Sequence, residues 1–115
     1  MEQLNSVELR GNVGMVKYQG SKEKPMSIFS VATNKSYSST DGSILIETTW
    51  HNIVAYEGKD VKGVELIDKG KKVYVRGRIR NQKFTGADGT EHYSYDILAN
   101  KLEILPDTEP LTSEN

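Results

Sequence analysis

The chain has no cysteine among its 115 residues. This absence excludes disulfide bonds, cysteine-ligated zinc sites and a thiol nucleophile. No apolar run approaches the ~20 residues that a membrane-spanning helix needs, and no stretch near the N-terminus resembles a signal peptide. We therefore expect a protein that has no membrane partner and resides in the cytoplasm.

Residues typical of catalysis and metal binding are also scarce. The two histidines, His51 and His92, lie far apart, and neither has metal-ligand spacing around it. No glycine-rich phosphate loop precedes a helix, and neither a nucleophile turn nor a cluster of carboxylates occurs. The sequence therefore predicts a protein that is not an enzyme and that holds no metal and no cofactor.

The composition that remains is that of one globular domain. Hydrophobic residues make up 36% of the chain, which is enough for a core. They follow a period of two more often than 3.6, and β-branched and aromatic residues are dense, so strands predominate. Five strands are predicted, at residues 6–18, 26–33, 44–56, 71–84 and 91–105. In the first, Val7, Leu9, Val13 and Met15 share one side, and Gly11 and Gly14 indicate a bulge or bend.

The connections between these strands indicate the fold. Residues 34–42 are predicted to form a polar loop, and residues 86–89 a hairpin turn. One short helix is predicted around residues 60–69. Five strands with a helix between the third and the fourth is the order of the OB-fold, an all-β Greek-key barrel. An SH3-like barrel or a short β-sandwich fits the strand count but not the helix position.

Charge is unevenly distributed along the chain. Residues 106–115 carry three acids and no base, and we expect a short disordered acidic tail after a domain that covers residues 1–105. Without this tail, 15 bases and 13 acids remain. Seven of the bases and no acid lie in residues 69–83: Lys69, Lys71, Lys72, Arg76, Arg78, Arg80 and Lys83. Such a block indicates an anionic partner, although a solvated strand face is the alternative.

Alternation along the fourth predicted strand sorts its side chains into two faces. Val73, Val75 and Ile79 form the apolar side. The other side carries Lys72, Tyr74, Arg76, Arg78, Arg80, Gln82 and Phe84. Bases interleaved with aromatic rings suit single-stranded nucleic acid, which offers phosphates to a basic groove and bases to aromatic platforms.

Two further aromatic residues are candidates for contact with nucleic acid. The neighbours of Trp50 at two residues on either side are Thr48 and Asn52, which favours exposure of the indole; a core tryptophan is the alternative. Tyr37 lies in the predicted polar loop, where no core needs it, and a surface tyrosine without function is the alternative. His51 falls on the face opposite Trp50 and is expected to pack or to lie at an interface.

Several segments together resemble the bacterial single-stranded DNA-binding protein (SSB) family. They are Gly-Asn-Val-Gly at 11–14, Phe-Ser-Val-Ala-Thr-Asn at 29–34, Glu-Thr-Thr-Trp-His-Asn-Ile-Val-Ala-Tyr at 47–56, the stretch 69–80 and Lys-Phe-Thr at 83–85. Each alone is weak, but the order and spacing are specific. The resemblance covers about residues 4–105.

The resemblance implies an OB-fold that binds single-stranded DNA without sequence preference in replication, recombination and repair, at the nucleoid. It implies a homo-oligomer, with a tetramer favoured and a dimer possible, in which His51 lies at the subunit interface. The stacking rings would be Tyr37, Trp50, Tyr56 and Phe84. The phosphate contacts would be Lys69, Arg80 and Lys83, with Lys35 and Lys59 in addition.

The chain also departs from the family pattern. Asn52 stands where relatives often carry a base, and the ten residues after 105 replace a long linker and an apolar-ended acidic tip. We therefore do not expect partner proteins to bind through this tail. Two other functions stay open: an OB-fold accessory protein that acts mainly through protein–protein contacts at replication restart, and a binder of single-stranded RNA.

Overall fold

The computed structural model describes residues 2–107. Five strands form one closed barrel in the order β1-β2-β3-β5-β4. They are β1 (Val7–Gly20), β2 (Pro25–Ser38), β3 (Ile44–Tyr56), β4 (Lys72–Thr85) and β5 (Glu91–Leu105), with a 3-10 turn, η1 (Val64–Leu66), between β3 and β4. The predicted OB-fold with one short helical segment in that position is confirmed. No helix in the described part of the chain is long and apolar enough to span a membrane.

The core consists mainly of β-branched side chains that point inward from alternate strand positions. Among the fully buried residues are Val31 on β2, Ile53 on β3, and Val73 and Val75 on β4. Complete burial of each such side chain stabilises the fold by about 1.5–3 kcal/mol. These residues therefore fix which face of each strand points outward.

A bulge in β1 reverses the outward and inward faces of that strand. The register with β2 shifts between Val13 and Val16. Val13 is buried and Val16 packs against the core, whereas Met15 is 80% exposed. A bulge inserts one residue into the alternation, so the predicted bend is confirmed and the prediction that Met15 shares the inward side is wrong.

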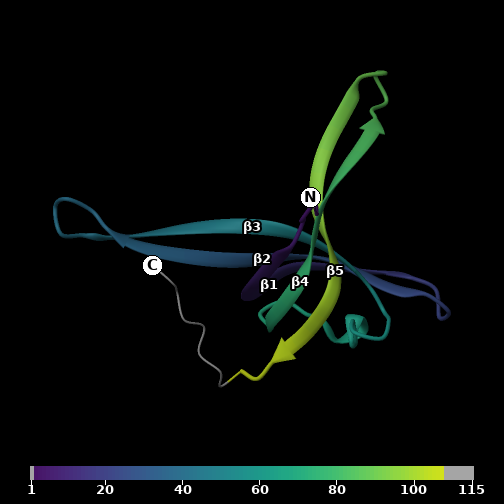
Figure 1. Cartoon of the computed structure of the whole chain (residues 1–115), viewed down its shortest axis with the longest axis horizontal. Helices are drawn as coiled ribbons and strands as arrows, with labels where there is room; N and C mark the ends of the chain where they lie inside the picture. The colour runs from purple at the N-terminus through teal and green to yellow at the C-terminus, as the bar shows by residue number, and fades with distance from the viewer. Residues whose placement is uncertain (1, 108–115) are drawn as a thin grey trace.

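The ladder between β2 and β3 continues beyond the range predicted from the sequence. It runs without a register shift from Met26 opposite Tyr56 to Ser38 opposite Ile44. Residues 34–38, predicted as loop, therefore belong to β2, and only the turn that follows is irregular. Polar residues are tolerated here because this part of the hairpin extends from the barrel, where neither face needs burial (Figure 1).

The helical segment is shorter than the ten residues predicted. It begins after Gly63, whose φ of 82° lies in the left-handed region. The Glu57 carboxylate accepts hydrogen bonds from the backbone N–H groups of Gly63 and Val64, both at 3.1 Å. Val64 is buried, and its carbonyl accepts a hydrogen bond from the hydroxyl of Ser27. These contacts fix the segment without a longer helix.

Two long hairpins leave the barrel in different directions (Figure 1). One joins β2 to β3, and the other joins β4 to β5. The ladder between β4 and β5 shifts register between Arg76 and Gly77. A Cβ at Gly77 would lie 2.2 Å from the Leu98 carbonyl oxygen, so only glycine lets the two strands approach this closely. Two residues later Ile79 is 48% exposed. Ile79 keeps the predicted face, because it is opposite Ile97, which is buried in the core, but at the margin of the barrel it stays half exposed.

Candidate nucleic-acid interface

Trp50 lies on the surface, where its indole covers β1. The side chain is 58% exposed, which rules out the core alternative. A Cβ built on Gly14 would lie 2.4 Å from Cζ3 of the indole, so only glycine leaves room for the ring there. The shallow pocket beside the ring is lined by Gly14, Met15, Val16, Trp50, Asp68 and Lys69. An exposed ring and a lysine thus line one groove.

Tyr37 and Lys35 form a second pairing of ring and base on the β2–β3 hairpin. Both line a groove with Ile44, and Tyr37 is 47% exposed. Tyr37 pairs with Leu45 in an uninterrupted ladder. Alternation therefore puts Tyr37 and Trp50 on opposite faces of the hairpin. A strand that contacts both rings has to cross the edge of the hairpin.

Tyr56, at the end of β3, lies between two bases. Lys24 Nζ lies 5.8 Å from the centroid of the Tyr56 ring, within the range of a cation–π contact. Arg80 is near enough for Tyr56 to contribute to its raised pKa. Sequence reasoning missed Lys24, because only the pairing of Met26 with Tyr56 in the β2–β3 ladder brings this turn beside the end of β3.

Phe84 is exposed on the β4–β5 hairpin but has a ring partner. Its ring stacks on His92, with centroids 5.2 Å apart and planes 18° from parallel. The neighbouring Lys83 forms an ion pair with Glu91 at 3.0 Å. One face of the Phe84 ring is therefore covered, while 54% of the residue remains exposed.

Arg80 is held by an acid on the adjacent strand. Its Nε and Nη2 donate to the two carboxylate oxygens of Asp96, each at 3.0 Å. The bidentate hydrogen bonds with Asp96 raise the pKa of the Arg80 guanidinium above its ordinary value. Asp96 is opposite Arg80 in the ladder, a register that the sequence does not reveal. Much of the charge of Arg80 is thus compensated.

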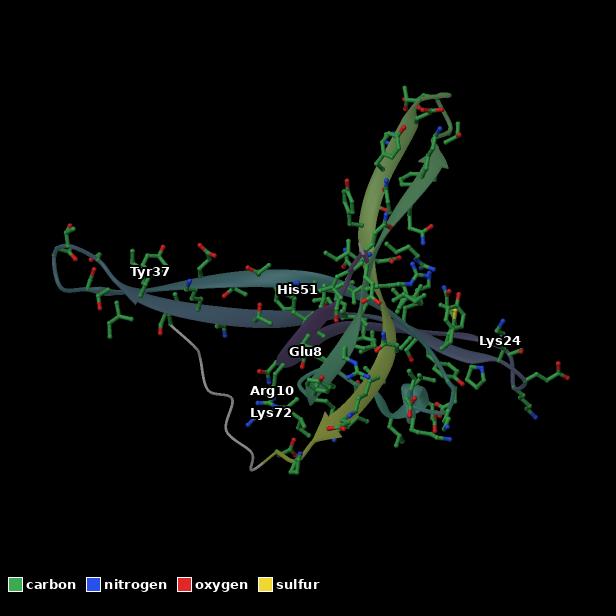
Figure 2. The ribbon with its side chains drawn as sticks, in the orientation of Figure 1. Glu8, Arg10, Lys24, Tyr37, His51 and Lys72 are labelled. Atoms are coloured by element: carbon green, nitrogen blue, oxygen red, sulfur yellow. The ribbon has the colours of Figure 1, made fainter. Side chains whose placement is uncertain are left out.

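Lys72 and Arg76 lie apart from the hairpins, on the outer wall formed by β1, β4 and β5. Figure 2 shows Glu8, Arg10 and Lys72 close together there. Tyr74 donates its hydroxyl to Glu8 at 2.8 Å, and the Arg10 guanidinium lies 6.0 Å from the Tyr74 ring centroid. Lys72 Nζ donates to the carbonyl of Asp107 at 3.0 Å, and Arg76 Nε donates to Asn100 at 3.3 Å. Arg10 is a second base that sequence reasoning missed.

Four of the candidate bases keep their charge uncompensated. Within residues 2–107, no ion pair with an acid is formed by Lys35, Lys59, Lys69 or Arg78. Lys35 and Lys69 each line a groove with an exposed ring. These two lysines therefore combine the charge and the position that contact with phosphate requires.

His51 lies where the β2–β3 hairpin joins the barrel (Figure 2). Its Nε2 is 2.9 Å from the Thr33 hydroxyl, and burial lowers the pKa of the imidazole below its usual 6.5. It is opposite Val31 in the ladder, on the face away from Trp50.

The four candidate rings do not converge in one pocket. Tyr37 lies on the β2–β3 hairpin, whereas Lys24, which is beside Tyr56, lies at the other end of the molecule (Figure 2). These two lie toward opposite ends of the 51 Å long axis. Such an arrangement suits an extended polymer, not a compact ligand.

The fold and these surfaces define a small OB barrel whose hairpins carry exposed rings beside bases. Residues 4–105 match the Single-strand binding protein family, and the chain belongs to this family. A single-stranded DNA-binding protein from Neisseria meningitidis is 37% identical over 105 residues, covering 89% of this chain and 60% of that protein. A mitochondrial one from Oryctolagus cuniculus is 31% identical, covering 90% and 76%.

Solved structures give the same result for the fold. A Plasmodium falciparum SSB in complex with ssDNA aligns with a TM-score of 0.71 at 30% identity, over 92% of this chain and 98% of that one. The family resemblance seen in the sequence is confirmed. The chain spans about 60% of the length of the Neisseria relative.

Proposed function

We propose that this protein binds single-stranded DNA without preference for base order, by stacking bases on exposed rings and pairing phosphates with lysine and arginine. The observation that carries the proposal is Trp50, a 58% exposed indole in one groove with Lys69. A hydrophobic ring held on the surface beside a cation matches the two chemistries of a single strand. Membership of the family and the ssDNA-bound relative from Plasmodium falciparum support the same ligand.

The proposed path has three parts. Tyr37 with Lys35 and Trp50 with Lys69 each offer a ring and a base in one groove, and Tyr56 offers a ring beside Lys24. From Tyr56 the path continues to Phe84, on the face of β4 that also carries Arg78. Arg80 and Lys83 contribute less charge because Asp96 and Glu91 pair with them. Lys72 and Arg76, on the outer wall, would contact only a strand that wraps the barrel. Protection of single strands in replication, recombination and repair is the role we infer.

Self-association belongs to the same proposal. Val7–Gly11 pairs with β4 only, and β2 takes over the ladder from Asn12 onward. Among residues 2–107, one edge of this half of β1 thus has no ladder partner, which favours pairing with a second copy. We infer a homo-oligomer built on β1, with His51 at a subunit contact and a tetramer favoured over a dimer. Light scattering at micromolar concentration tests this, and a monomer that binds DNA fully contradicts it.

The accessory alternative also has an observation in its favour. Ile44 and Ile46 are 72% and 69% exposed near the end of the β2–β3 hairpin, where apolar side chains suit a protein partner. This alternative requires weak affinity for DNA. The RNA alternative requires equal affinity for oligo(rU) and oligo(dT), because ring stacking does not distinguish the sugars.

Trp50 is the only tryptophan, so its fluorescence reports on the groove directly. We expect oligo(dT) to quench it and duplex DNA of equal length to bind more weakly. Trp50→Ala should weaken binding of a fluorescently labelled oligo(dT) about tenfold to a hundredfold, since stacking is worth about 1–3 kcal/mol per base. Lys69→Ala should weaken binding and flatten the salt dependence, whereas Lys62→Ala, with the same charge change outside the groove, should not. Preference for duplex, or a folded Trp50→Ala protein of unchanged affinity, contradicts the proposal.

A further inference from the structure

The β4–β5 hairpin carries two exposed tyrosines on the face that turns away from Phe84. Tyr93 is 59% exposed and Tyr95 is 65% exposed. They are opposite Lys83 and Asn81 in the ladder, whereas Phe84 is opposite His92. Because the register is regular along this hairpin, alternation separates the two sets onto opposite faces. Neither tyrosine contributes to the buried core.

We propose that this tyrosine face (Asn81, Lys83, Tyr93 and Tyr95) is a second base-stacking surface for single-stranded nucleic acid. A strand that leaves Phe84 would cross the hairpin edge and continue on the reverse side. The inference rests on the proposed function, and it adds rings that the path described above does not use.

The spacing of the two rings fits consecutive nucleotides. Residues two apart on a strand are about 6.8 Å apart, twice the ~3.4 Å rise per nucleotide of a stacked strand. Bases of an extended single strand can therefore meet one ring each without stacking on each other. Between them the face offers the Asn81 amide and the Lys83 ammonium, which hydrogen-bond to bases and phosphates.

The size of the face argues against a protein partner. From Ile79 to Thr85 the hairpin presents seven residue pairs, a strip of about 24 Å by 10 Å, or about 240 Å². A stable protein–protein interface needs about 800 Å² on each side. Two or three nucleotides need far less surface, and the rings here alternate with polar groups.

The carboxylate of Glu91 competes with a phosphate for Lys83, and its removal tests the proposal. Glu91 forms the ion pair with Lys83 at 3.0 Å, and it accepts the Tyr93 hydroxyl at 3.4 Å. A phosphate at this face would have to displace Glu91 from Lys83. Glu91→Gln should therefore strengthen the binding of long oligo(dT) and increase its salt dependence.

The main experiment compares Tyr93→Thr/Tyr95→Thr with Tyr93→Phe/Tyr95→Phe. Threonine keeps a strong strand preference but removes the ring, whereas phenylalanine keeps the ring. With oligo(dT) of about 16 nucleotides, the upper end of the range that one OB domain occupies, the threonine variant should lose about tenfold or more in affinity. The phenylalanine variant should bind as the wild type does. With about 6 nucleotides, enough for the Trp50 groove alone, both should bind normally.

Stoichiometric titration of Trp50 fluorescence should also show the threonine variant occluding about two nucleotides fewer, one for each lost ring. Circular dichroism and the melting temperature verify the fold, and the two single threonine variants replace the double one if it does not fold.

The outcomes separate this inference from the proposed function. If Trp50→Ala weakens binding but the threonine variant keeps its affinity and site size, the second surface does not exist while the first does. If Trp50→Ala also has no effect, the proposed function itself fails. If the threonine variant changes its mass by light scattering with unchanged affinity, the face contacts a second copy and the inference is overturned. Equal losses in the phenylalanine and threonine variants overturn it too, because the ring would not be the cause.

Discussion

Gly14→Ala tests whether the position of the Trp50 ring matters for binding. The Cβ of alanine would lie 2.4 Å from Cζ3 and 2.8 Å from Cη2 of the indole. Ordinary contact begins at 3.4 Å, so the ring has to move outward by about 1 Å. The backbone at Gly14 has no positive φ, so alanine adds no backbone strain. Its Cβ would also lie 2.9 Å from the Ser30 hydroxyl oxygen, which has to shift slightly as well.

The expected result is a loss of affinity with little change in stability. Replacing glycine by alanine at a compatible position stabilises a protein by about 0.4–1 kcal/mol through the unfolded state, which offsets part of the cost of moving the indole. Stacking is worth about 1–3 kcal/mol per base. If displacement removes half of the upper value, the affinity for oligo(dT) should fall about tenfold.

The matched control is Gly58→Ala, because a Cβ there meets only the Tyr56 carbonyl oxygen at 3.9 Å. Intrinsic fluorescence, thermal unfolding and titration with labelled oligo(dT) are measured on both variants. A shifted emission maximum in Gly14→Ala with unchanged affinity would refute the view that the indole stacks a base. A lower affinity without any change in emission would refute the view that Gly14 positions the ring.

Two further predictions concern charge. Burial lowers the pKa of His51 from 6.5 in the folded protein, so the unfolded chain binds a proton at this imidazole more tightly. The free energy of unfolding should therefore fall as the pH drops below about 6.5, and it should level off below the folded-state pKa. Chemical denaturation of wild type and His51→Gln at about pH 8 and about pH 5 tests this, and the variant should lose this part of the pH dependence. Binding should also show a slope of log affinity against log salt of about −2 per protomer, since the proposed path uses three uncompensated candidate bases, Lys35, Lys69 and Arg78, at about −0.7 each. A slope of about −6 would mean that all eight candidate bases, including those paired with acids, engage phosphates.

Strand positions and fold class could be predicted from the sequence because both depend on local alternation and turn chemistry. The inward face of β4 follows directly from Val73 and Val75 at alternate positions, whereas the buried residues of β3, Ile53 to Ala55, are consecutive and do not show alternation. Asp88-Gly89 marks a turn wherever it stands, and the structure places it in the β4–β5 connection. Which side chains of β1 point inward after Val13 could not be predicted in the same way, because the bulge reverses the direction of every later side chain.

The candidate site was only partly predictable because its charge balance depends on register. Arg80 and Asp96 are 16 residues apart, and only the pairing of β4 with β5 brings them to 3.0 Å. In the same way, only the pairing of β2 with β3 brings Lys24 to Tyr56. The exposure of Tyr93 and Tyr95 could not be predicted, because alternate apolar residues on a strand usually indicate a core face. That rule fails where the hairpin extends past the barrel and both faces are exposed.

The acids of β5 explain why the basic block of β4 is a weaker electrostatic surface than its sequence indicates. Glu91 pairs with Lys83 and Asp96 pairs with Arg80, so the β4–β5 hairpin offers a ligand mainly aromatic rings and little net positive charge. Uncompensated charge remains elsewhere, beside Tyr37 and Trp50, on other strands and loops. Rings and free bases are thus interleaved around the barrel, not concentrated on one strand. On the proposed path, a strand would therefore exchange one contact at a time, because the binding energy would be divided among several pairings of ring and base.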